Sequence, residues 1–256
     1  MTKGPTERAP RPSVSAPPDP VAAGPIGERW RDAFLDILSH ELRTPITTIY
    51  GGALLLATRQ LAPAHARALA DDVRMEADRL YRLVEDLVVL ARSERDGIRP
   101  AREPVAIGQL VKTAVERELE RHRGLEIEFR GGSDAAADGA DETMVAHVVR
   151  NLLDNAMRYG DYARPIVVEV HVDPREVAVR VIDHGVPPDP DREPFELSAH
   201  PSATAAGRAG AGIGLYVADR LVRAMGGRMW ATPSEPDGAE FGFALARFNG
   251  LRQSEV

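Results

Sequence analysis

His40 is the residue of this sequence best placed to do covalent chemistry. It lies in the stretch SHELRTP (39–45), where the carboxylate of Glu41 follows it and Thr44 comes one helical turn later. A neutral imidazole is a good nucleophile near neutral pH, and an adjacent carboxylate can take the proton that attack releases. These residue types suit acceptance of a phosphoryl group. Because a lone exposed histidine is more often simply solvated, a phosphoryl donor site must be found elsewhere in the chain.

A second set of candidate residues shares one face of a predicted helix. The stretch RNLLDNAMRYG (150–160) spaces Asn151, Asn155 and Arg158 by four and three residues. An asparagine carbonyl oxygen is a ligand that Mg²⁺ accepts when phosphates and waters complete its octahedron, and a guanidinium binds phosphate. The alternative is that the asparagines cap or decorate a surface helix.

Two glycine-containing turns supply further candidates. VIDHG ends an apolar strand at Asp183, whose carboxylate could accept from an adenine amino group while Gly185 leaves room for the ring. Farther on, GRAGAGIGLYVADRLV places several glycines before an amphipathic helix, where free backbone amides can hold phosphates. These glycines are Gly207, Gly210, Gly212 and Gly214. A flexible hinge is the alternative, and the absence of a following Lys-Ser or Lys-Thr excludes a P-loop.

A long helix with a heptad pattern must carry His40. Apolar residues from about Glu28 to Gln60 recur at alternating steps of three and four, and a second such seam runs from Val73 to Ala91. A short turn joins the two helices, which therefore form an antiparallel hairpin. Such a hairpin leaves much of its apolar stripe uncovered, which predicts a homodimer in which two hairpins form a four-helix bundle.

The same heptad positions predict how the phosphoacceptor stretch is presented. They put His40 on the outer face of the helix, with Glu41 and Thr44 beside it on the solvent side. Pro45 lacks a backbone donor and clashes with the preceding turn, so we expect a bend next to His40.

The remainder of the chain predicts an α+β multidomain protein. A Pro/Ala-rich tail (1–26), predicted to be disordered, precedes the hairpin (27–95), and a linker (96–103) leads to a second domain (104–250) and a short C-terminal tail (251–256). Alternating strands are predicted at 125–131, 165–173, 176–185 and 239–248, and helices at 108–122, 141–159 and 212–227. This order predicts helices layered on one face of a mixed sheet.

Composition narrows the possible partners. A net charge of −7 and a pI near 5.6 provide no general basic field for nucleic acid. The absence of cysteine excludes disulfides and thiolate metal sites, and no apolar run is long enough for a membrane helix. We therefore expect a cytoplasmic protein that does not span the membrane.

Taken in order, these segments resemble the transmitter core of sensor histidine kinases of two-component systems, from about residue 28 to 250. FLDILSHELRTPI resembles the phosphoacceptor box, RNLLDNAMRYG the N box, VIDHG the first glycine box, EPFEL the F box and GAGIGL the second glycine box. The resemblance implies a Bergerat-type α/β sandwich as the ATP-binding domain, a fold shared with gyrase, Hsp90 and MutL.

The family's site residues can be placed on matching positions. The resemblance implies that His40 accepts the γ-phosphoryl group of ATP, that Glu41 acts as base, and that Thr44 positions water when the phosphorylated partner is dephosphorylated. It implies Asn155 as the main Mg²⁺ ligand. The other implied nucleotide-site residues are Asn151, Arg158, Tyr159, Asp183, Gly185, Gly210, Gly212, Gly214 and Leu215.

The resemblance also implies the partners. The phosphoryl group would pass to an aspartate of a separate response regulator, because no receiver domain fits within this chain. Since the sequence contains no recognisable sensor, a separate sensor protein is a candidate source of input.

One position departs from the family pattern. The first glycine box normally reads Asp-x-Gly-x-Gly, but Pro187 replaces the second glycine, and proline has no amide to donate. The alternative function is therefore a catalytically impaired dimeric scaffold or a phosphatase-biased module. A gyrase-type ATPase switch or an anti-sigma-type serine kinase is a further alternative, but these proteins lack the phosphoacceptor hairpin.

Overall fold

The computed structural model describes residues 25–122, 124–132, 134–161, 163–190, 193–197, 212–234 and 238–248, with the side chains of all of these except 25–33 and 94–96. Most of the predicted N-terminal tail, the C-terminal tail, Gly207 and Gly210 lie outside the described residues. The first helix begins at Pro25, inside the segment predicted as tail.

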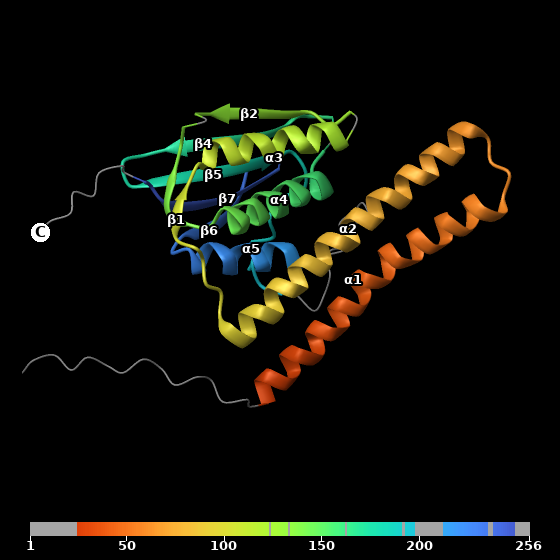
Figure 1. Cartoon of the computed structure of the whole chain (residues 1–256), viewed down its shortest axis with the longest axis horizontal. Helices are drawn as coiled ribbons and strands as arrows, with labels where there is room; N and C mark the ends of the chain where they lie inside the picture. The colour runs from red at the N-terminus through yellow and green to blue at the C-terminus, as the bar shows by residue number, and fades with distance from the viewer. Residues whose placement is uncertain are drawn as a thin grey trace, which may run out of the picture.

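Two long antiparallel helices form the N-terminal hairpin, as the heptad pattern predicts (Figure 1). Helix α1 spans Pro25–Thr58 and continues through Pro45, and α2 spans Pro63–Asp96 with its proline at the first helical position. The two helices approach closely at Gly52, which is buried. A Cβ at this position would collide with a methyl group of Val73, so the close approach depends on glycine. The hairpin thus holds the phosphoacceptor stretch in the middle of α1.

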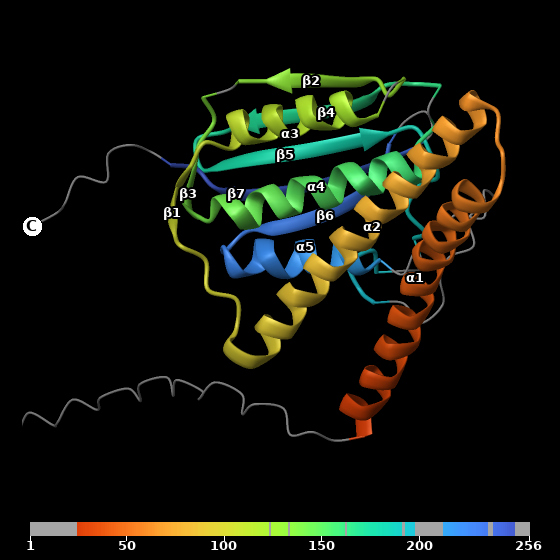
Figure 2. The ribbon, with the colours of Figure 1, turned by 45° about the vertical axis from the view of Figure 1, so that its right-hand side comes forward.

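The second domain is a sheet covered by helices on one face (Figures 1 and 2). Its helices are α3 (Ile107–Arg121), α4 (Glu142–Tyr159) and α5 (Ile213–Ala224), and its strands are β1 (Glu103–Val105), β2 (Ile127–Gly131), β3 (Ala137–Ala140), β4 (Ile166–Val172), β5 (Glu176–Asp183), β6 (Arg228–Pro233) and β7 (Ala239–Ala246). The main sheet has the order β2-β4-β5-β7-β6, with β2 and β4 parallel and the other neighbours antiparallel. The predicted mixed sheet is confirmed, whereas β1, β3 and β6 were not predicted.

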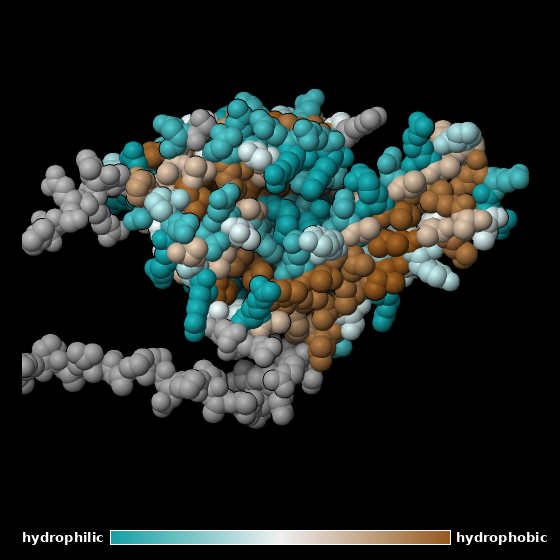
Figure 3. All heavy atoms as spheres, in the orientation of Figure 1, coloured by the Kyte–Doolittle hydropathy of each residue, from teal (hydrophilic) through white to brown (hydrophobic). Residues whose placement is uncertain are grey.

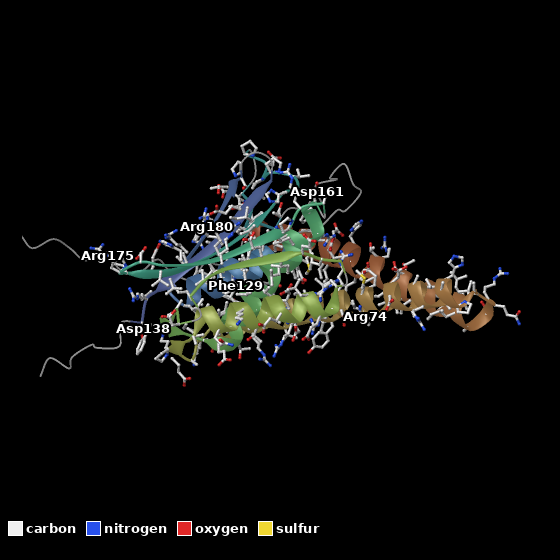
Figure 4. All side chains as sticks on the ribbon, turned by 90° about the horizontal axis from the view of Figure 1, so that it is seen from above. Arg74, Phe129, Asp138, Asp161, Arg175 and Arg180 are labelled. Atoms are coloured by element: carbon white, nitrogen blue, oxygen red, sulfur yellow. The ribbon has the colours of Figure 1, made fainter. Side chains whose placement is uncertain are left out.

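Strict alternation along β5 decides which side chains reach the core. Val177, Val179 and Val181 are buried under the helices, and Asp183 continues the same face at the end of the strand. The intervening Arg180 points to the opposite face, where it pairs with Glu169 of β4 and Glu240 of β7 (Figure 4). The alternation of side chains along β5 therefore directs the carboxylate of Asp183 to the helix side of the sheet.

A buried carboxylate on the hairpin contacts two side chains of α4 in the second domain. Asp86 of α2 is 5% exposed, and its Oδ1 lies 2.5 Å from His147 Nε2 and accepts from Asn151 Nδ2 at 3.2 Å. Helix α2 runs obliquely past α4 and α5 in both ribbon views (Figures 1 and 2). Removal of either partner of a buried charged group leaves it uncompensated, so this contact fixes how the two domains meet.

Ion pairs and a hydrogen bond surround this buried contact. Arg82 Nε lies 2.7 Å from Asp154 Oδ2, and Arg150 Nη1 lies 2.8 Å from Glu85 Oε2. At the far end of α2, Arg220 of α5 donates to Ser93 Oγ at 3.2 Å. The contact between the hairpin and the second domain therefore includes several polar pairs beside the buried Asp86.

Within the described part of the chain, no helix combines the length and the apolar character that crossing a bilayer requires.

The Arg82–Asp154 pair predicts a pH dependence of stability. Burial raises the pKa of the Asp154 carboxyl from 3.8 to about 6, although Arg82 acts to lower it. Between these values the folded chain keeps a proton that the unfolded chain releases, so rising pH removes stability. Asp154→Asn removes this titrating group. We expect its free energy of unfolding to rise relative to that of the wild type by up to about 3 kcal/mol between pH 4 and pH 6.5. Denaturant unfolding curves of the two proteins measure this difference.

The matched control is Asp78→Asn on α2, where the carboxylate is 46% exposed and pairs only one turn away with Arg74. The difference in free energy of unfolding between this control and the wild type should not vary over the same pH range. If the difference in free energy of unfolding between Asp154→Asn and the wild type is constant with pH, the raised pKa of Asp154 is contradicted.

Candidate active site

A cavity of about 540 Å³ lies where the second domain meets the hairpin. The hairpin residues in its wall are Glu41, Arg79, Arg82, Leu83 and Asp86. The predicted nucleotide-site residues in its wall are Asn151, Asn155, Arg158, Tyr159, Asp183, Gly212, Gly214 and Leu215. The cavity therefore brings most of the predicted ATP-site residues together, and it adds charged residues of the hairpin that were not predicted.

Helix α4 presents the N-box side chains because its other face is buried. Asp141 caps the helix by accepting from the Met144 amide at 3.0 Å, and apolar residues such as Val148 and Leu152 pack into the core. Asn155 and Arg158 consequently lie along the cavity side, as their spacing predicts.

The end of α4 stacks a cation over an aromatic ring. The Arg158 guanidinium lies 5.7 Å from the centre of the Tyr159 ring, and burial raises the pKa of Tyr159. Both side chains line the cavity. Tyr159 therefore offers an apolar ring and Arg158 a fixed positive charge at the same end of the helix.

One carboxylate oxygen of Asp183 is available to accept a hydrogen bond from a ligand. The residue is 1% exposed, and its Oδ1 accepts from the Gly185 amide at 2.8 Å. Its Oδ2 is buried and has no hydrogen-bond partner among the described residues. Burial raises the pKa of this carboxyl, against the effect of backbone amides that donate to it. A buried acceptor of this kind needs a donor, and the amino group of adenine would supply one.

The glycines serve different purposes. A Cβ at Gly185 would collide with the carbonyl oxygen of Tyr159 and lie 2.8 Å from Gly160 Cα, so this glycine lets the turn after β5 pack against the end of α4. Gly212 adopts a left-handed conformation (φ 69°) at the start of α5. Gly214 accepts from Asn151 Nδ2 at 2.8 Å, which ties the glycine turn to the N-box helix.

His40 is exposed and Glu41 is not. The His40 side chain is 56% exposed, in agreement with its heptad position. Glu41 was predicted on the solvent side but is only 7% exposed, because α2 and the docked ATP domain cover that face of α1. Its Oε2 accepts from Arg79 at 3.0 Å and lies 3.8 Å from Arg158 Nη1, while its Oε1 lies 3.9 Å from His40 Nδ1.

Two other predicted residues lie at the margin of the site. Thr44 is exposed on α1, one turn after His40, and is not part of the cavity wall. Pro187, which replaces a glycine of the first glycine box, lines the cavity together with Pro188. The wall at this point is therefore apolar and lacks the amide that a glycine would provide.

Sequence reasoning missed the contribution of α2. Arg79, Arg82 and Asp86 line the cavity, but none of them was predicted as a site residue. A signal was available, because the three charged residues recur at steps of three and four and therefore share one helix face. A charged stripe beside an apolar seam indicates a second, polar contact surface.

The residues present fit a magnesium nucleotide. The unpartnered Asp183 oxygen suits an adenine amino group, and the cations of the cavity suit phosphates. No cluster of three or more acidic, histidine or cysteine side chains that could hold a metal occurs among the described residues. The carboxamide oxygen of Asn155, in the cavity wall, is a ligand that Mg²⁺ accepts, and phosphate oxygens and waters would complete the coordination.

Comparison with known proteins gives matches to both parts of the chain. Residues 30–96 match the His Kinase A (phospho-acceptor) domain, and residues 140–248 match the histidine kinase-, DNA gyrase B- and HSP90-like ATPase domain. The sensor protein KdpD of Escherichia coli is 30% identical over 85% of this chain and 24% of its own length. The histidine-protein kinase/phosphatase MprB of Mycolicibacterium smegmatis is 32% identical over 78% of this chain and 41% of its own length.

Solved structures agree with these matches. The histidine kinase AdeS of Acinetobacter baumannii superimposes with a TM-score of 0.56 over 82% of this chain and 98% of its own, at 22% identity, which shows the fold. Full-length ShkA in complex with AMPPNP gives a TM-score of 0.56 over 82% of this chain and 44% of its own, at 26% identity. The chain spans about a quarter of KdpD and less than half of MprB. With both domains matched in order and the fold shared, the chain belongs to the sensor histidine kinases and carries their transmitter core.

Proposed function

We propose that this chain uses Mg·ATP to phosphorylate its own His40 and then passes the phosphoryl group to an aspartate of a response regulator. The observation that carries the proposal is the wall of one cavity, in which Glu41, the neighbour of His40, stands with Asn155 and Asp183. The nucleotide site and the acceptor stretch are thus adjacent within a single chain. The binding of AMPPNP by ShkA, which is similar over 82% of this chain, supports the nucleotide.

The geometry around His40 indicates which nitrogen atom reacts. Nδ1 faces Glu41 at 3.9 Å, so the tautomer protonated at Nδ1 has the Nε2 lone pair directed outward. Nε2 attacks the γ-phosphorus and forms the N–P bond, while the bond to the β,γ-bridging oxygen breaks and its electron pair leaves on ADP. The Nδ1 proton passes to Glu41. Arg158 and the amides at the start of α5 would neutralise the phosphates.

The hairpin also carries the surface expected of a dimer. A hydrophobic band runs along it in the space-filling view (Figure 3). Large apolar side chains that are at least 43% exposed occur on both helices, namely Leu35, Ile46, Tyr50, Leu54 and Leu55 on α1 and Met75, Tyr81, Val84 and Val88 on α2. A second hairpin that buries this band would complete a four-helix bundle, and the response regulator would dock on the same hairpin near His40.

The proposed dimer can be tested by introducing charged residues into the apolar band of the hairpin. We expect Val84→Glu combined with Val88→Glu to give single chains of 27.8 kDa in light scattering, whereas the wild type gives twice this mass. Buried carboxylates without partners would oppose association. Leu119→Glu on α3, where the leucine is 38% exposed, is the matched control and should remain dimeric. A wild-type chain that is monomeric at micromolar concentration would refute the dimer.

Autophosphorylation is tested with ATP labelled at the γ-phosphate. The wild type should gain label that acid removes and alkali does not, as expected of an N–P bond. His40→Gln should abolish the label but keep nucleotide binding, because its side chain lies outside the cavity wall. Asn155→Ala should abolish both. Label that persists in His40→Gln would place the acceptor elsewhere, and nucleotide binding that persists in Asn155→Ala would remove that residue from the site.

Pro187 supports the alternative of an impaired kinase with mainly scaffold or phosphatase activity. It lines the cavity where the family pattern has glycine, and it has no amide to offer a phosphate. We expect Pro187→Gly to bind ATP with equal or higher affinity and to phosphorylate at an equal or higher rate. A wild type that binds nucleotide but gains no label, together with a Pro187→Gly variant that does, would establish the alternative. A clear loss of affinity in Pro187→Gly would show that the proline is part of a working site.

A further inference from the structure

Two arginines from different helices hold the base of the proposed reaction. Arg79 of α2 donates to Glu41 Oε2 at 3.0 Å, and Arg158 of α4 lies 3.8 Å from the same oxygen. The Glu41 side chain is only 8% exposed, so these cations are its main compensation for burial. Both guanidinium groups contact Oε2, whereas the other oxygen, Oε1, faces His40.

The same two guanidinium groups face the nucleotide cavity. Arg79, Arg158 and Glu41 all line it. The third arginine in the wall, Arg82, already has a close partner in Asp154 at 2.7 Å and is 18% exposed. Arg79 is 28% exposed, and its second carboxylate partner, Glu76, is more distant at 3.7 Å. Its long side chain therefore allows the guanidinium to change partner.

A bound triphosphate must compete with Glu41 for these cations. Phosphate oxygens accept paired hydrogen bonds from a guanidinium at least as well as a carboxylate does. We expect a γ-phosphate bound in the cavity to draw Arg79 from Glu41. The carboxylate then loses one of its two cationic partners while its Oε1 still faces His40.

We propose that Arg79 is a positioning residue that couples nucleotide loading to release of the base: it holds Glu41 before the triphosphate binds and moves to the γ-phosphate afterwards. The inference rests on the proposed function, and it adds a residue of α2 to that reaction. Arg79 acts through Glu41 and the phosphate, and the bonds made and broken remain those of the transfer from ATP to His40.

The test measures binding of Mg·ADP and Mg·AMPPNP to the full chain by calorimetry, in a cycle of wild type, Glu41→Gln, Arg79→Gln and the double variant. If Glu41 and the γ-phosphate compete for Arg79, Glu41→Gln should tighten AMPPNP binding by about three- to tenfold and ADP binding by less than about twofold. In the Arg79→Gln background, the tightening of AMPPNP binding should largely disappear. In an Arg79→Lys background, Glu41→Gln should again tighten AMPPNP binding in part, because lysine keeps the positive charge but lacks the paired donors of a guanidinium.

Arg74→Gln is the matched control, because Arg74 lies on the same helix and pairs with Asp78 one turn away (Figure 4). It should change neither affinity. Equal tightening by Glu41→Gln in the presence and absence of Arg79 would overturn the proposal, because it would reflect only removal of a negative charge from the cavity. Lower thermal stability of Arg79→Gln with unchanged AMPPNP affinity would also overturn it. A wild type that binds neither nucleotide would refute the proposed function itself.

Discussion

The contact of Asp86 with helix α4 is the interaction on which the rest of the site depends. A carboxylate that is 5% exposed receives an imidazole and a carboxamide from the ATP domain, and loss of one partner of such a group typically costs about 3–5 kcal/mol. The carboxamide belongs to Asn151, which also donates to Gly214 at the start of α5. The hairpin, helix α4 and the start of α5 are therefore joined through the side chain of Asn151.

The parts of the site that sequence predicted are those set by local periodicity. Spacings of four and three placed Asn155 and Arg158 on one face of α4, and alternation along β5 brought Asp183 to the helix side of the sheet. The heptad pattern similarly predicted the hairpin and the exposure of His40. These features need only the geometry of one helix or one strand, so the residue order contains them.

The parts that were missed depend on what packs against an element. The heptad pattern shows which face of α1 meets α2, but not that a docked domain covers Glu41, and so it predicted exposure for a buried carboxylate. The strands β1, β3 and β6 are short or only partly buried and have weak alternation. The roles of Arg79 and Asp86 likewise become evident only when two domains are placed together.

Among the described residues, the cations that line the cavity are all arginines, namely Arg79, Arg82 and Arg158, and the whole chain has only two lysines. A guanidinium keeps its proton at every pH at which a protein stays folded. The cations of this site are therefore fixed charges, and a carboxylate can pass from one to another without any proton being exchanged. The positive charge that these arginines give the cavity wall is therefore independent of pH over the range in which the protein is folded.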